Sequence, residues 1–79
     1  MFYVYILFSK SLDKFYTGQT ANLEKRLIRH NSKLVRSTKN GIPWDLRWST
    51  QVPSRAEAVL LEKKIKKRGA RRYLNDIGM

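Results

Sequence analysis

The N-terminal segment places the strongest constraint on the fold. Residues 2–8 are apolar or aromatic, and no charge interrupts them. A run of this kind predicts a β-strand buried on both faces, since a half-buried strand would alternate apolar with polar residues. In a chain of 79 residues, such a strand has to share one small core with the other elements, so we expect a single domain over residues 1–79.

A turn and a second strand follow this segment. Residues 14–17 have a strand-like composition and come after a polar stretch, and two short strands joined in this way predict an antiparallel hairpin. A turn centred between residues 10 and 11 would make Tyr5 and Tyr16 direct cross-strand partners, about 4.5–5.5 Å apart at Cβ. The two phenols would then face the same side of the sheet.

The middle of the chain predicts a helix, a loop and a third strand. Asn22 is a typical N-cap, and the helix that it opens is expected to end near Asn31. Residues 32–43 are polar and basic and indicate a loop. In residues 44–49, two tryptophans and a leucine alternate with polar residues, which predicts a strand with one face toward the core.

A capping box marks the longest helix. Residues 54–57, with the sequence Ser-Arg-Ala-Glu, predict the start of a helix over residues 55–68, and Gly69 is expected to end it. A last helical turn is expected over residues 70–75. The apolar stripe of the long helix comprises Ala58, Leu60, Leu61 and Ile65. The order β-β-α-β-α-α predicts an α+β fold with helices packed against a small antiparallel sheet.

The charge of the chain indicates a polyanionic partner. Lys and Arg number 17 against 6 Asp and Glu, so the net charge is +11. Nucleic acid is the commonest partner for such an excess, and both DNA and structured RNA are compatible with it. A membrane surface is the weaker alternative, because no basic helix has an opposite face rich in Trp, Phe and Leu. We expect no membrane partner.

The cysteine content and the lack of targeting patterns indicate which kinds of site and which cellular location to expect. The chain has no cysteine, which excludes a disulfide framework and a cysteine-based zinc site. No stretch reaches the roughly 18 apolar residues of a membrane span, and residues 2–8 lack the flanking pattern of a signal peptide. We therefore expect a cytoplasmic protein.

Four residues, in order, carry a resemblance to a known family. They are Tyr5 in the motif Tyr-Val-Tyr, Tyr16 in the motif Tyr-Thr-Gly, Arg26 near the start of the first helix, and Glu62 within the second. Over residues 3–67 this pattern resembles the GIY-YIG endonuclease superfamily, in particular its small single-domain members and the N-terminal incision domain of the bacterial excision-repair nuclease. The resemblance implies a three-stranded antiparallel sheet flanked by helices, in agreement with the α+β prediction.

The resemblance also implies roles for individual side chains. Tyr16 would accept a proton from the attacking water, although a free phenol has a pKa of about 10, and Tyr5 would support it by hydrogen bonding. Arg26 would contact the scissile phosphate through its planar guanidinium. His30, four residues later on the same helix face, would bond Tyr16 or the phosphate, or take part in proton transfer.

Glu62 is implied to be the single protein ligand of Mg²⁺ or Mn²⁺, with waters and phosphate oxygens completing the coordination. Judged by spacing alone, an ion pair with Lys66 is the simpler interpretation. Asn75 stands near the position of an asparagine that helps to orient the active site in several relatives. Gln19 stands where some relatives carry a lysine that contacts phosphate.

Basic side chains outside the catalytic set predict further contacts with phosphates. Seven of the ten residues from 63 to 72 are Lys or Arg. Phosphate contacts position a substrate without reading its sequence, so we expect weak sequence preference. The predicted contacts are Lys25, Arg29, Lys63, Lys66, Lys67 and Arg71.

The function predicted from these features is a divalent-metal-dependent endonuclease that hydrolyses DNA phosphodiester bonds by nicking, in repair or recombination. The alternative is a binding module for DNA or structured RNA with little or no activity. A protein partner for targeting would fit either function.

Overall fold

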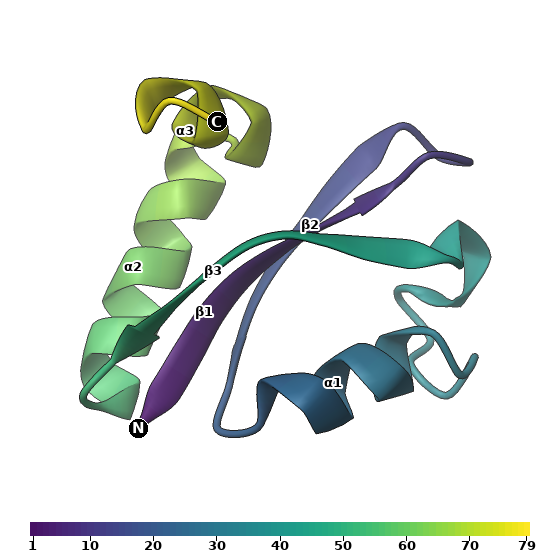
Figure 1. Cartoon of the computed structure of the whole chain (residues 1–79), viewed down its shortest axis with the longest axis horizontal. Coiled ribbons are helices and arrows are strands. Elements are labelled where there is room, and N and C mark those ends of the chain that lie inside the picture. Colours follow the sequence, from purple (N-terminus) through teal and green to yellow (C-terminus); the bar gives the residue numbers. More distant parts are fainter.

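A three-stranded antiparallel sheet lies at the centre of the molecule, with its strands in the order β2-β1-β3. The computed structural model describes all 79 residues. In Figure 1, α2 and α3 lie on one side of the sheet and α1 on the other. The elements are β1 (Phe2–Ser9), β2 (Lys14–Thr20), α1 (Leu23–His30), the 3₁₀ turn η1 (Lys39–Gly41), β3 (Trp44–Val52), α2 (Arg55–Arg68) and α3 (Ala70–Asp76). The predicted α+β fold and element order are confirmed.

The apolar run of β1 is explained by its central place in the sheet. Val4 and Ile6 point to the α2 side, where they pack with a core that includes Ala58, Ile65 and Leu74. Tyr5 and Leu7 point to the α1 side, where they pack with Trp44. All four β1 side chains are at most 1% exposed, so the prediction of burial on both faces is confirmed.

The register of the hairpin differs from the prediction by two residues. Tyr5 lies opposite Gly18, and Tyr16 lies opposite Leu7. The reason is the turn, which occupies the four residues 10–13 and ends with Asp13 in the left-handed region at φ 51°. A shift of two residues preserves the alternation of faces, so both phenols still point to the α1 side.

The prediction that β3 turns one face to the core was wrong for Trp48. The register shifts between Ile6, opposite Trp48, and Leu7, opposite Leu46, which leaves Arg47 as an extra residue in a β-bulge. Beyond the bulge the side chains change faces. Trp44 therefore packs on the α1 side, whereas Trp48 packs on the α2 side.

Helix ends agree with their predicted caps. The Asn22 side chain accepts a hydrogen bond from the Lys25 amide at 3.0 Å, the Ser54 hydroxyl accepts one from the Glu57 amide, and Gly69 ends α2 at φ 92°. The apolar stripe of α2 needs one correction, because Leu60 is 67% exposed. None of the helices has the length and hydrophobicity that crossing a bilayer requires.

Candidate active site

Four of the predicted catalytic side chains meet on the α1 side of the sheet. Tyr5 comes from β1, Tyr16 from β2, and Arg26 and His30 from one face of α1. The ring centroid of Tyr16 lies 6.5 Å from that of Tyr5 and 4.9 Å from that of His30. The four-residue spacing on α1 allows two of its side chains to reach the same pair of phenols.

Gly18 is part of this cluster because it provides the space that the Tyr5 phenol occupies. A Cβ atom at position 18 would lie 2.5 Å from Tyr5 Oη and 2.7 Å from Tyr5 Cζ. No other residue type fits there unless the phenol moves. The glycine of the Tyr-Thr-Gly motif is thus required by the close approach of a side chain from the neighbouring strand.

His30 is fully buried and uses both ring nitrogens within the protein. Nε2 lies 2.9 Å from the Tyr5 hydroxyl, and Nδ1 lies 3.0 Å from the Thr38 hydroxyl. Burial, together with the nearby charges of Arg26 and Arg29, lowers the pKa of His30 to about 4. The imidazole is therefore neutral near pH 7. Its hydrogen-bond partners are Tyr5 and Thr38, and it meets Tyr16 only through an edge-on ring contact.

Thr38 is a site residue that the sequence did not reveal. It lies in the segment predicted as a loop, and its side chain is fully buried. Its carbonyl accepts a hydrogen bond from Trp44 Nε1 at 2.6 Å. The Asn31 side chain in turn pairs with the Trp44 backbone, accepting from the amide at 2.7 Å and donating to the carbonyl at 3.2 Å. These bonds fix the loop against the core, although no spacing rule in the sequence marks Thr38.

The two phenols differ in environment. Tyr5 is 1% exposed, and burial raises its pKa, opposed by the Arg26 guanidinium and supported by the negative charge of Glu62. Tyr5 is therefore protonated near pH 7, with its hydroxyl bonded to His30. Tyr16 is half-buried, and its hydroxyl lies beside the Arg26 guanidinium.

Arg26 lies next to both phenols. Interaction with Tyr5, and to a smaller extent with Tyr16, raises the pKa of its guanidinium. Its Nε atom is buried and has no hydrogen-bond acceptor. A buried donor without a partner is costly, so the site has an unmet need for an acceptor at this point.

Glu62 is the only predicted catalytic residue on α2. Its side chain is 20% exposed, and Oε2 forms an ion pair with Lys66 Nζ at 2.7 Å. No group of three or more potential metal ligands surrounds it. A single carboxylate fits Mg²⁺ or Mn²⁺ when waters and substrate phosphates complete the coordination. The residues present thus fit a weakly held cation that binds together with the substrate.

Comparison with known families shows to which family the chain belongs. The model of the GIY-YIG catalytic domain matches residues 1–75. The chain belongs to the GIY-YIG family. Comparison with curated proteins and with solved structures gives no significant match. GIY-YIG domains are generally endonucleases that use divalent metals, so membership supports a nuclease-type function and a nucleic-acid substrate.

The remaining predicted residues of this GIY-YIG domain are exposed on its helices. Asn75 is exposed on α3, and no side-chain hydrogen bond joins it to the cluster. Lys25 and Arg29 are exposed on α1. The other predicted phosphate contacts are exposed on α2 and α3, across the sheet from α1 (Figure 1), and comprise Lys63, Lys66, Lys67 and Arg71.

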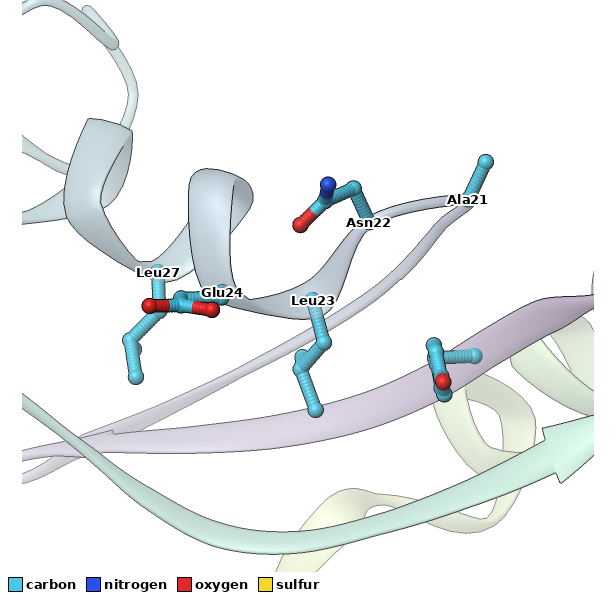
Figure 2. Close-up of a pocket in the computed structure, with 6 residues that line it drawn as sticks. Ala21, Asn22, Leu23, Glu24 and Leu27 are labelled. Carbon is cyan, nitrogen blue, oxygen red and sulfur yellow. The ribbon is translucent and has the colours of Figure 1, made fainter.

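The one recess in the surface of the domain does not coincide with the catalytic cluster. Figure 2 shows it at the N-terminal end of α1, where the side chains of Leu23 and Leu27 extend toward the sheet. The complete lining is Tyr3, Ala21, Asn22, Leu23, Glu24 and Leu27. None of the predicted catalytic residues contributes to it.

Proposed function

We propose that this GIY-YIG domain is a divalent-metal-dependent endonuclease that hydrolyses DNA phosphodiester bonds, one strand at each active site, in repair or recombination. The observation that supports the proposal most strongly is the cluster on the α1 side. It combines a half-buried phenol, Tyr16, with the guanidinium of Arg26, whose buried Nε has no acceptor. Arg26 as a whole is only partly buried, and a guanidinium is a donor of the kind that binds a phosphate oxygen.

The environments of the two phenols suggest different roles. Tyr5 is buried, and its hydroxyl is already bonded to His30, so it is badly placed to accept a proton from water. Tyr16 is half-buried, and its hydroxyl lies beside the Arg26 guanidinium instead of against His30. In the proposed reaction Tyr16 reacts as its phenolate and accepts the proton of the attacking water, which leaves a neutral phenol and a hydroxide that attacks the phosphorus. Arg26 binds the scissile phosphate, and Tyr5 holds its neighbours in place.

Glu62 is the residue that would hold the divalent cation. Its ion pair with Lys66 would have to open or be shared, which would release the ammonium of Lys66 toward a phosphate. When bound, the cation supplies positive charge that stabilises the leaving oxygen.

Nicking of supercoiled plasmid in Mg²⁺, in Mn²⁺ and in chelator tests the proposal. The variants are Tyr16→Phe and Glu62→Gln. Matched controls are Tyr3→Phe, which removes a hydroxyl from the same sheet face, and Glu57→Gln, which removes a charge from the same helix. We expect metal-dependent nicking that only the two site variants lose. Nicking that survives in both of them would refute this assignment of the site.

A nucleic-acid-binding module without activity is the second candidate. The feature that favours it is the ion pair that already engages Glu62. This candidate predicts salt-dependent DNA binding that is indifferent to divalent metal, with no nicking by the wild type. Competition between structured RNA and nicked DNA would then identify the preferred nucleic acid.

A further inference from the structure

Three buried polar side chains form a continuous hydrogen-bonded chain that includes two members of the catalytic cluster, Tyr5 and His30. Tyr5 bonds to His30 at 2.9 Å, and His30 bonds to Thr38 at 3.0 Å. The three side chains come from β1, from α1 and from the loop before β3, and each is at most 1% exposed. Side chains this deeply buried depend on one another for their hydrogen bonds, so the direction of each bond matters.

A second contact of the Thr38 hydroxyl favours one direction. A neutral imidazole carries one N–H donor and one bare acceptor nitrogen. The Thr38 hydroxyl donates to the Val35 carbonyl at 3.4 Å, so its oxygen is left to accept from His30 Nδ1–H. His30 Nε2 is then the bare nitrogen, and the Tyr5 hydroxyl donates to it.

We propose that Thr38 is a positioning residue of this site: its hydroxyl selects the Nδ1–H form of His30, which holds the hydroxyl hydrogen of Tyr5 away from Arg26. The Tyr5 oxygen then offers its lone pairs to the guanidinium, which can only donate. In the opposite tautomer, His30 Nε2–H would donate to Tyr5, and the phenolic hydrogen would have to face the cation. The role in the reaction rests on the proposed nuclease function.

The hydrogen-bonded series of Tyr5, His30 and Thr38 positions side chains and does not conduct protons. It ends at the backbone carbonyl of Val35, which does not take up a proton near neutral pH. Thr38 is itself held by the bond from Trp44 Nε1, and Trp44 is held by the Asn31 side chain. The loop thus carries one buried hydroxyl to a fixed place behind the phenols.

The tautomer of His30 provides a direct test. The chain has a single histidine, so untagged protein labelled with ¹⁵N-histidine gives one set of imidazole signals. Long-range ¹H–¹⁵N correlation spectra distinguish a protonated ring nitrogen from a bare one. We expect wild type without DNA to have protonated Nδ1 and bare Nε2. The Nε2–H form in wild type would overturn the inference, and this measurement needs no variant that has to fold.

Variants of Thr38 test whether its hydroxyl selects the tautomer of His30. Thr38→Val keeps the shape but removes the acceptor, and we expect it to populate the Nε2–H form and to nick at least roughly tenfold more slowly, as displaced catalytic groups do. Thr38→Ser should restore both the tautomer and the rate. Ser37→Ala, which removes an exposed hydroxyl from the same loop, should change neither.

Thr38→Val with an unchanged tautomer would overturn the inference, as would an altered tautomer with wild-type nicking. Because the tautomer is measured in the absence of DNA, its outcome is separate from the plasmid assay that tests the proposed function.

Discussion

At the scale of single residues, we expect Tyr5 to contribute mainly to stability and Tyr16 mainly to catalysis. The hydroxyl of Tyr5 is buried against His30, whereas Tyr16 is only half-buried. Tyr5→Phe leaves His30 Nε2 unpaired and should lower the free energy of unfolding by about 1–3 kcal/mol. Tyr16→Phe should lower it by less than about 0.5 kcal/mol but abolish nicking.

Urea denaturation and plasmid nicking of the same two preparations measure both quantities. Equal stability losses in the two variants would contradict the hydrogen-bond assignment, because only one of the two hydroxyls would leave a buried group without a partner.

His30 should make the fold sensitive to acid. Its pKa falls from 6.5 to about 4 in the folded state through burial and the charges of Arg26 and Arg29. Between these pH values the unfolded chain binds the proton more readily, so stability is lost as the pH falls from about 6.5 to about 4, by up to about 3 kcal/mol.

Urea midpoints at pH 7 and at pH 4.5 test this prediction. His30→Gln is the control, because it removes the titrating group, and its stability should fall less across the same interval. A wild type and a His30→Gln variant with parallel pH profiles would show that other groups dominate.

Among the strands, the pairing of β1 with β2 depends on the glycine under Tyr5. Gly18→Ala would force its Cβ into the phenol of Tyr5 and should cost about 1–3 kcal/mol, as overpacking does. Nicking should fall together with stability, because the same phenol supports the catalytic cluster. Tyr5→Leu should relieve part of the clash, so a double-mutant cycle in urea would measure a favourable coupling between the two changes. Purely additive losses would argue against the contact.

The bulge in β3 decides which face Trp48 occupies. Arg47 is the extra residue at the shift in register, and beyond it Trp48 packs edge-on against Tyr73, with ring centroids 5.4 Å apart. Deletion of Arg47 should rotate the rest of the strand to the other face and prevent cooperative unfolding. Arg47→Ala, which keeps the bulge, should retain a cooperative transition in thermal melts. A deletion variant with a normal melting curve would refute this function of the bulge.

At the scale of the whole molecule, the predicted DNA contacts lie on both sides of the sheet. Lys25 and Arg29 belong to α1, and Lys63 and Lys67 belong to α2, on the opposite side (Figure 1). The molecule measures only 29 × 25 × 17 Å, so one duplex edge would lie within reach of both helices.

Substitutions with Gln should show whether both helices contact DNA. Each basic side chain that no longer meets a phosphate should reduce the magnitude of the slope of log K against log salt by about 0.9. The pair Lys25→Gln and Arg29→Gln and the pair Lys63→Gln and Lys67→Gln should therefore each lower the slope, and their effects should add. A slope that responds to only one pair would place the DNA on one side of the sheet.

Much of the fold was predictable because it depends on local signals. Asn22, Ser54 and Gly69 mark helix ends through cap chemistry that operates within three or four residues. The hairpin register was not predictable, because a turn of two residues and a turn of four residues are both compatible with the same polar stretch. The exposure of Leu60 likewise depends on how α2 is rotated against the sheet.

The candidate site likewise combines features that local sequence signals predict with features that depend on tertiary contacts. The types and order of the elements, the burial of β1 on both faces, the basic character of the chain and the order of Tyr5, Tyr16 and Arg26 could all be predicted from the amino-acid sequence. These properties follow from composition, periodicity and spacing along the chain. The burial of Tyr5, the face that Trp48 takes and the hydrogen bond of Thr38 to His30 became known only from the folded structure. Those outcomes depend on contacts between different elements, and local sequence patterns do not encode such contacts.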